Sequence, residues 1–206
     1  MASEVGIINR ALIELGQKRI VARTDTSVEA VTMDAIYDDI RDTMLRSHQW
    51  NFATKRLKLA RSANTPSHEF DFQYPVPSDW LRTVEVSSSD AGGTDIRYKM
   101  GYDATDTRVF LCDATELWLT YIAQITDPAA FGPDFRTLLS YELAKAATIT
   151  LKNSRPLRDD FRRDAQAAWL RATGSDAIED MPDRRPDGSW TTSRGGGHYP
   201  RGYWPR

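Results

Sequence analysis

The spacing of apolar residues changes twice along this chain, and these changes limit the folds open to it. Near the N-terminus, Val5, Ile8 and Leu12 recur at steps of three and four residues, the period of a helix with one buried stripe. Between residues 70 and 76, apolar and polar residues alternate, which is the period of a half-buried strand. Helical spacing returns after Pro133. This order predicts an α+β fold in which helices flank a β region.

Two helices are predicted before residue 50. The first covers residues 3–15, and Gly16 suits the position after a helix, where a left-handed backbone is common. The second begins at Thr26, because Glu29 three residues later can complete a capping box. It ends near His48. Its buried stripe is formed by Met33, Ile36, Tyr37, Ile40 and Met44.

The middle of the chain is predicted to be a β region. Candidate strands cover residues 52–59, 70–76, 81–86, 96–100, 108–112 and 117–122. The connections between them are too short for crossover helices, so an antiparallel meander is favoured over parallel units. Cys112 falls in an alternating strand and is interpreted as a small core residue.

The C-terminal third is predicted to hold two more helices and an arm. One helix follows Pro133, and the other begins at Pro156 and ends near Gly174. Beyond Met181 the sequence is rich in Gly, Pro, Ser and Arg and lacks apolar periodicity. The predicted organisation is a four-helix bundle (residues 1–49 and 128–176), an inserted antiparallel β domain (50–127) and an extended C-terminal arm (177–206).

The composition argues against an internal disulfide, a bound metal and a membrane-spanning segment. One cysteine cannot form an internal disulfide, and the three histidines lack zinc-ligand spacing, so no metal or other cofactor is expected. No apolar run approaches the roughly 20 residues that a bilayer requires, and the first residues do not resemble a signal peptide. A soluble protein without membrane contact, made in a reducing cytoplasm, is expected.

Carboxylates at steps of four residues mark the second helix. Asp34, Asp38 and Asp42 could form an acid/base pair or bind a divalent cation. A solvated acidic face that also carries Arg41 is the favoured interpretation, because the sequence indicates no desolvating cleft. Ser47 and His48 are adjacent and point in different directions on a helix, so catalysis is disfavoured and no enzyme is expected.

A basic run follows the second helix. Lys55, Arg56, Lys58 and Arg61 could contact DNA or a neighbouring subunit. One exposed cationic face of a strand is the favoured interpretation.

Arginines and large aromatic side chains distinguish the predicted arm from an idle linker. Such residues dominate the energetics of protein interfaces, so an arm that folds onto a protein partner is favoured over a tail without a fixed partner. A weak contact between these residues and nucleic acid is a further alternative. The candidate interface residues are Arg184, Arg185, Trp190, Arg194, Tyr199, Arg201, Tyr203 and Trp204.

Three segments together resemble the head-to-tail adaptor family of tailed bacteriophages, also called the tail tubular protein A family. They are Ile8–Gln17, Ser47–Ala53 and Tyr74–Arg82, and the helical segment from Phe135 to Thr150 is similar as well. The resemblance implies a dodecameric ring between the portal protein and the tail tube or nozzle, through which genomic DNA leaves the capsid. It also implies a β domain that faces the tail and an extension that reaches the portal.

The expected location is therefore the head–tail junction of the virion, with assembly in the host cytoplasm. Asp34, Asp38 and Asp42 are candidates for the channel lining, since an acidic lumen would repel DNA phosphates. The alternative interpretation is that the chain is another neck or minor tail protein. A nucleic-acid binding module or a tail-associated hydrolase is less favoured.

Overall fold

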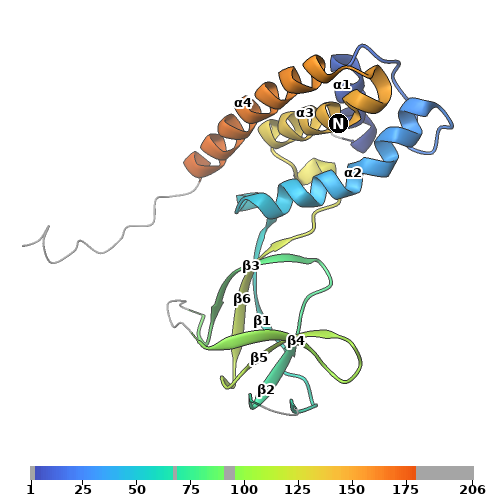
Figure 1. Ribbon diagram of the computed structural model, residues 1–206. Coiled ribbons are helices and arrows are strands. Elements are labelled where there is room, and N and C mark those ends of the chain that lie inside the picture. The colour runs from blue at the N-terminus through green and yellow to red at the C-terminus, as the bar shows by residue number, and fades with distance from the viewer. Residues whose placement is uncertain (1–2, 67–68, 91–95, 180–206) are drawn as a thin grey trace, which may run out of the picture.

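The computed structural model describes residues 3–66, 69–90 and 96–179. This part of the chain is an α+β structure with four α-helices and two antiparallel sheets (Figure 1). The helices are α1 (Glu4–Glu14), α2 (Val28–Ser47), α3 (Pro133–Lys152) and α4 (Arg155–Glu179). The strands are β1 (Thr54–Leu59), β2 (Phe72–Pro75), β3 (Trp80–Ser87), β4 (Tyr98–Tyr102), β5 (Arg108–Cys112) and β6 (Leu117–Ala123), with short 3-10 turns at Asn51–Ala53 and Pro128–Ala130.

The predicted ends of the first two helices are largely confirmed. The Ser3 hydroxyl caps α1 by accepting from the Gly6 N–H at 3.0 Å, and Gly16 adopts a φ of +59° after the helix. The predicted start of α2 is wrong by one residue. Ser27, and not Thr26, is the N-cap, and its hydroxyl accepts from the Ala30 N–H at 3.2 Å.

Helix α4 runs further than its sequence suggests. It does not end at Gly174 but continues to Glu179, so residues 177–179 of the predicted arm are helical. An interior glycine weakens a helix by only about 1 kcal/mol, and packing of Ala172 and Asp176 on the inner face offsets such a cost. Among the described residues, no helix combines the length and apolar character needed to cross a bilayer.

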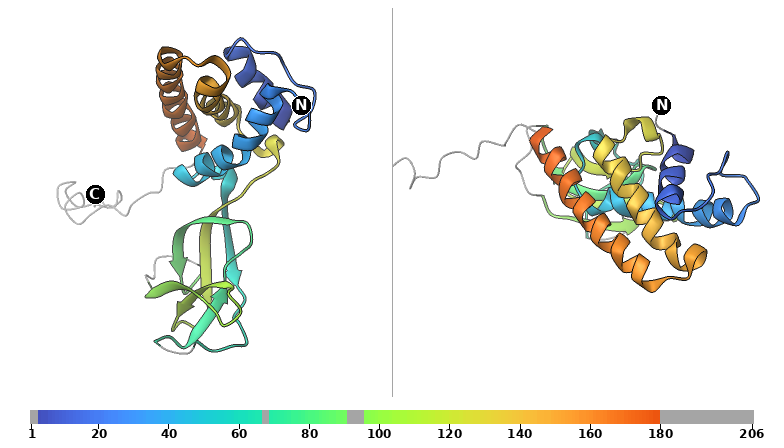
Figure 2. Two further views of the ribbon diagram at one scale, coloured as in Figure 1. Left: turned by 45° about the vertical axis from the view of Figure 1, so that its right-hand side comes forward. Right: turned by 90° about the horizontal axis from the view of Figure 1, so that it is seen from above.

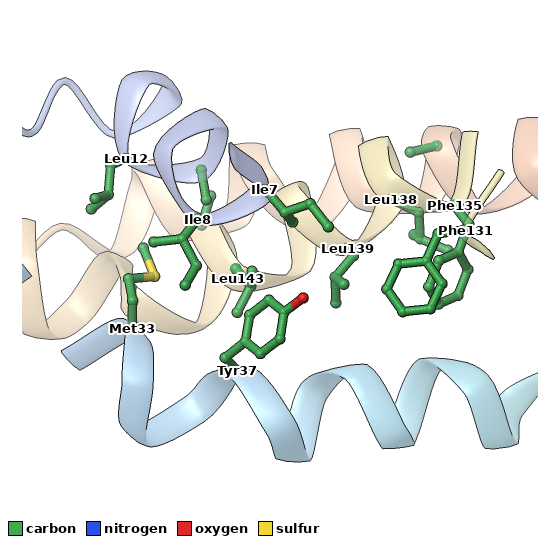
Figure 3. Packing of buried hydrophobic residues seen from close by; sticks show 14 of the residues in the cluster. Ile7, Ile8, Leu12, Met33, Tyr37, Phe131, Phe135, Leu138, Leu139 and Leu143 are labelled. Carbon is green, nitrogen blue, oxygen red and sulfur yellow. The ribbon is translucent and has the colours of Figure 1, made fainter. Parts of the chain in front are cut away.

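One hydrophobic core holds the helices together. The apolar stripes of α1 and α2 face α3, which also packs along α4 (Figure 3). Ile8 and Leu12 of α1 meet Met33 and Tyr37 of α2, and all four side chains are fully buried. The central position of α3 explains its run of buried apolar residues: Phe135, Leu138, Leu139, Leu143, Ala144 and Ala147.

The strands form two three-stranded sheets with the orders β1-β6-β3 and β2-β5-β4. All pairs are antiparallel, as predicted, but the expected meander is wrong, because β6 returns to lie between β1 and β3. The register places Leu57 opposite Leu119 and Leu59 opposite Leu117. Closing β6 into the first sheet lets the apolar faces of the two sheets cover each other.

A second core lies between the two sheets. It is built from residues such as Tyr74, Phe110, Leu119 and Tyr121, and Cys112 is fully buried among them, as predicted. Several strand bounds differ from the prediction. Residues 52–53 belong to a 3-10 turn, β2 is limited to Phe72–Pro75, and β4 begins two residues later than expected.

Two chain segments join the helices to the sheets, one between α2 and β1 and one between β6 and α3 (Figure 1). The sheet β1-β6-β3 lies next to the helices, and the sheet β2-β5-β4 lies at the far end of the molecule (Figure 2). The described part is therefore elongated, with helices at one end and strands at the other.

Candidate interaction site

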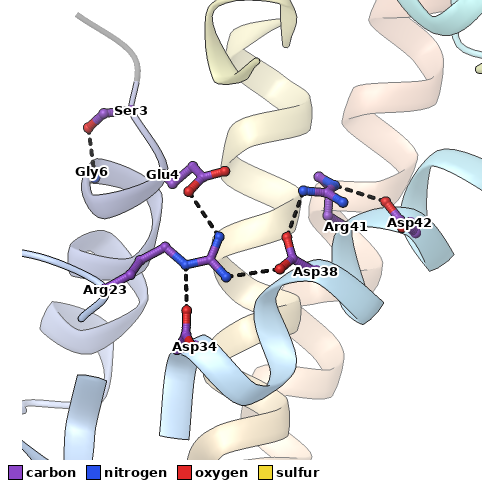
Figure 4. Close-up of polar contacts among 8 residues, drawn as sticks. All are labelled: Ser3, Glu4, Gly6, Arg23, Asp34, Asp38, Arg41 and Asp42. Atoms are coloured by element: carbon purple, nitrogen blue, oxygen red, sulfur yellow. Dashed lines mark hydrogen bonds and ion pairs between the residues drawn. The ribbon is translucent and has the colours of Figure 1, made fainter. Parts of the chain in front are cut away.

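The acidic residues of α2 surround an arginine from the loop that precedes the helix. Arg23 forms ion pairs with Glu4 at 2.9 Å, Asp34 at 2.7 Å and Asp38 at 2.9 Å, each measured from a guanidinium nitrogen to a carboxylate oxygen (Figure 4). Its guanidinium also lies over the Tyr37 ring. Arg23 thus ties the start of α1 and the middle of α2 to the loop between them.

A second arginine continues this network along α2. Arg41 pairs with Asp38 at 2.7 Å and with Asp42 at 2.8 Å, and the amide of Gln124 donates to Asp42 at 2.6 Å (Figure 4 for the arginine contacts). The expectation that Arg41 lies on a solvated outer face is wrong, because its side chain is only 4% exposed. The three predicted carboxylates are brought together, but as partners of arginines.

The surroundings shift the pKa values of three groups in this network, Asp38, Arg23 and Tyr37. The hydrogen bond from Arg23 lowers the pKa of Asp38 below its usual value, although partial burial acts in the opposite direction. Burial opposes the charge on Arg23, but its three carboxylate partners outweigh that effect and raise its pKa. Burial raises the pKa of Tyr37 to about 12. A carboxylate whose pKa is lowered by a paired arginine, as at Asp38, suits a structural role better than proton transfer.

The residues at the end of α2 do not form a nucleophile and base. The Ser47 hydroxyl donates to the Met44 carbonyl at 2.7 Å, whereas the Nε2 atom of His48 lies 3.4 Å from the Asp176 carboxylate. The two side chains therefore engage different partners. Among the residues that the structure describes, no cluster of three or more His, Cys, Asp or Glu side chains is arranged to hold a metal ion.

The predicted basic run is divided between different surfaces. Arg56 and Lys58 share one face of β1, and Lys55 points to the other, as alternation along a strand requires. Lys55 pairs with Asp79 at 2.7 Å and Lys58 with Glu116 at 2.7 Å. Arg56 bonds the Asp90 carbonyl, and Arg61 lies over the Phe72 ring. Lys55 and Lys58 are thus paired with carboxylates, whereas Arg56 and Arg61 contact neutral groups.

Two groups of exposed apolar side chains lie at opposite ends of the molecule, and the sequence prediction missed both. Val28 and Val31, one turn apart at the start of α2, form the helical-end group and are 68% and 59% exposed. Val21, in the loop before α2, is 88% exposed. Tyr98, Met100 and Tyr102 form the β-end group on the edge strand β4 (Figure 1). The sequence did contain a signal of the helical-end group, because Val28 and Val31 are apolar but do not belong to the predicted buried stripe of α2.

Exposed large apolar residues gathered in one place usually mark a contact with another molecule. On β4, the three side chains alternate with Lys99 and Gly101 and therefore share one face of the strand. An edge strand also presents backbone groups that can pair with another chain. The β-end group is thus a second candidate contact surface.

Aromatic rings cluster at the joint between helices and sheets, the name used here for the region around the 3-10 turn Asn51–Ala53 between α2 and β1. The ring centroids of Trp50 and Phe135 lie 5.0 Å apart, and those of Phe52 and Phe135 lie 5.1 Å apart. A shallow pocket above these rings is bordered by Asp134, Asp176 and Glu179, among others. Ser47–Ala53, one of the segments that carry the family resemblance, contributes two of these rings.

No protein-family model matches this chain, and a search of curated proteins finds no significant relative.

The predicted interface residues of the arm lie outside the described residues. They are Arg184, Arg185, Trp190, Arg194, Tyr199, Arg201, Tyr203 and Trp204.

Proposed function

We propose that this chain is a structural head-to-tail adaptor of a tailed bacteriophage, one subunit of a dodecameric ring that joins the portal protein to the tail tube or nozzle. Function in such a protein is assembly, without a catalytic step. Another neck or minor tail protein of the same virion would use the same kind of surfaces and is the second candidate.

One observation carries this proposal: two exposed apolar groups at opposite ends of an elongated subunit. Val28 and Val31 are 68% and 59% exposed at the helical end, and Tyr102 is 63% exposed at the β end. A protein that joins two partners needs separate contact surfaces that face away from each other. A ring subunit also needs complementary surfaces for its neighbours.

The parts of the molecule have distinct roles in the proposed assembly. The four helices act as one bundle that packs against neighbouring subunits and rests on the portal. The β part, residues 50–127, is an inserted domain that faces the tail. The predicted C-terminal arm (177–206), of which residues 180–206 lie outside the described part, is assigned to the portal. Genomic DNA passes through the ring without sequence-specific contact.

The acidic side of α2 suits the channel lining. The network around Arg23 and Arg41 contains four carboxylates, from Glu4, Asp34, Asp38 and Asp42, against two guanidinium groups (Figure 4). A net negative charge remains, which would repel phosphates. A charge-neutralising Asp34→Asn substitution, measured by the rate of DNA ejection from assembled particles, would slow ejection if the residue faces the lumen.

Reciprocal substitutions at the two ends test the proposal. Purified chain is mixed with the portal protein of the same virion, and ring formation is followed by sedimentation velocity and negative-stain electron microscopy. Val28→Asp with Val31→Asp should abolish the ring on the portal. Met100→Asp with Tyr102→Asp should leave that ring intact but remove binding of the tail protein.

Each pair of substitutions is the control for the other. Failure of the unmodified chain to bind the portal would overturn the proposal, as would equal binding by both variants. A steep, salt-dependent shift of labelled DNA would instead favour a nucleic-acid binding module, and clearing of a cell-wall suspension would favour a hydrolase.

A further inference from the structure

Strand β4 lies at the edge of the sheet β2-β5-β4 (Figure 1). Among the described residues it pairs with β5 alone, in an antiparallel register that places Tyr98 opposite Cys112 and Met100 opposite Phe110. An edge strand presents backbone N–H and C=O groups on its outer side, where a strand of another chain can bind them. The hydrogen bonds on the inner side of β4 decide which of its residues offer these groups.

The hairpin between β4 and β5 sets the pattern of these bonds. The Asp103 N–H donates to the Thr107 carbonyl oxygen at 3.0 Å, so these two residues form a bonded pair. Bonded and non-bonded pairs alternate along antiparallel strands, and the next pair, Tyr102 and Arg108, is therefore non-bonded. In agreement, the Arg108 carbonyl oxygen accepts from the Val76 N–H at 3.0 Å, on the side of β5 where β2 lies.

This alternation assigns the outward groups of β4 to three residues. The N–H and C=O groups of Tyr98, Met100 and Tyr102 point to the free edge. Those of Lys99 and Gly101 are directed at β5. The three outward residues also carry the side chains of the β-end group, which are 39%, 40% and 63% exposed. Backbone groups and apolar side chains are thus available to the same partner strand.

The sequence of β4 is complementary to itself when two copies run antiparallel. With Met100 opposite Met100 of a second copy, Tyr98 lies opposite Tyr102 in both halves of the pairing. Outward residues then face outward residues, so each such pair can exchange N–H···O bonds. Aromatic side chains directly opposite each other stabilise a sheet, and methionine packs well against aromatic rings.

The two neighbouring registers that also place outward groups opposite each other are less favourable. A register centred on Lys99 sets two lysines directly opposite each other, which destabilises a sheet. One centred on Gly101 leaves Tyr98 opposite the hairpin turn, outside any strand. The register centred on Met100 instead places Lys99 opposite Gly101 of the second copy.

Opposite charges flank the strand in this register. Arg97 precedes β4 and lies opposite Asp103, which follows β4 in the second copy. The Arg97 guanidinium pairs with Glu69 at 2.6 Å, yet its side chain remains 67% exposed. Asp103 accepts the hydrogen bonds of its own turn through Oδ1. Its other oxygen, Oδ2, is the atom that Arg97 of the second copy can approach.

We propose that two copies of this chain pair through β4 in solution, in the antiparallel register centred on Met100. The sheets β2-β5-β4 of the two copies then form one continuous sheet across a two-fold axis. Two short strands bury less area than a standard interface of roughly 1,600 Å², so the association is weak and reversible. The inference does not depend on the proposed adaptor function, but such a dimer covers the β-end group and excludes a tail protein from it.

Amide hydrogen exchange of the full-length chain at two concentrations tests the contact residue by residue. In dilute protein, the outward N–H groups of Tyr98, Met100 and Tyr102 should exchange quickly. In concentrated protein, their exchange should slow by the factor by which the monomer fraction falls. The N–H groups of Lys99 and Gly101, which are directed at β5, should change little. Sedimentation equilibrium should show a mass that rises with concentration toward two chains and no further.

A proline removes the outward donor at the centre of the pairing. Proline is tolerated on an edge strand where its missing N–H would face outward, so Met100→Pro should keep the hairpin folded. Its dissociation constant for the dimer should rise at least about tenfold. Val28→Asp with Val31→Asp removes exposed apolar side chains from the other end of the molecule and is the control, which should dimerise like the parent.

Cysteine substitutions report the register without relying on the proline variant. The thiols of Met100→Cys meet across the two-fold axis, where Cα atoms about 5.5 Å apart allow a disulfide on mild oxidation. Lys99→Cys faces Gly101 of the second copy and should not crosslink, and the buried Cys112 stays out of reach. Crosslinking of Lys99→Cys in place of Met100→Cys, unchanged association of Met100→Pro, or a mass that is independent of concentration would overturn the proposal.

Discussion

The backbone N–H of Asn51 donates a hydrogen bond to the side-chain carboxylate of Asp176 at 3.0 Å, across a sequence separation of 125 residues. The Asn51 side-chain amide also donates to the Asp176 carbonyl oxygen at 2.7 Å. These two bonds fasten the last turns of α4 to the segment that leads from α2 into β1. They hold the end of α4 at the joint between helices and sheets.

Replacing this carboxylate should weaken the joint. In Asp176→Ala, the Asn51 N–H loses its acceptor in a partly buried place, which costs about 1–3 kcal/mol. The free energy of unfolding from urea titration measures the loss. Asp176→Asn keeps an acceptor oxygen and should lose clearly less. Equal losses in the two variants would contradict the importance of the acceptor.

Removing Arg23 should weaken the attachment of the start of α1 to α2, because Arg23 pairs with carboxylates of both helices. Arg23→Ala leaves Glu4, Asp34 and Asp38 without their shared cation, and we expect a loss of about 2 kcal/mol in urea unfolding. Arg163→Ala, which breaks an exposed pair with Asp160, is the control. That variant should stay within about 0.5 kcal/mol of the parent.

Acid should remove part of the stability through Asp38. Its hydrogen bond from Arg23 lowers its pKa in the folded protein, so the unfolded chain binds a proton first as the pH falls. The contribution is therefore complete above the ordinary aspartate pKa of about 4 and is lost as the pH falls through the folded value. Urea titrations at a series of pH values below about 5 measure this slope.

Asp38→Asn should make that slope shallower, and Arg23→Ala should do the same because the guanidinium is the cause. The double variant should show little further change, since both substitutions remove one interaction. An unchanged slope in Asp38→Asn would refute the assignment.

The Tyr37 hydroxyl should contribute nothing to stability. Its oxygen is buried and has no hydrogen-bond partner among the described residues, while its ring packs in the helical core. Tyr37→Phe removes the unpaired group and should leave the free energy of unfolding equal or raise it by up to about 1 kcal/mol. Tyr37→Ala should lower it by about 3–5 kcal/mol, because a cavity forms. A large loss in Tyr37→Phe would reveal a partner for the hydroxyl.

Alanine substitutions at two glycines should change the stability of the protein in opposite directions. Gly174 lies inside α4, and a Cβ added there would meet no atom outside the neighbouring helix backbone within 4 Å, so Gly174→Ala should raise stability by about 0.5–1 kcal/mol. Gly16 has a positive φ, so Gly16→Ala should lower stability by about 1 kcal/mol. Thermal unfolding of the two variants gives the comparison, and a loss in Gly174→Ala would contradict the helical path through that residue.

The sequence alone determined the order and type of the secondary structure. The three- and four-residue steps from Val5 to Ile8 and Leu12, and the alternation in residues 108–112, are local patterns, because side chains repeat at fixed periods on a helix and a strand. The same locality explains why the cap at Gly16 was predicted correctly. Ends that depend on packing, such as the end of α4, were placed less well.

Only the tertiary structure decided which distant residues meet. The spacing of Asp34, Asp38 and Asp42 indicated one acidic face, but nothing near them in sequence shows that Arg23 would fold into it. Likewise, β6 pairs with both β1 and β3, and Asp176 reaches Asn51, through contacts that separate stretches of chain make only after folding. A sequence period fixes which side of an element is apolar, whereas the burial of that side against another element selects its partner.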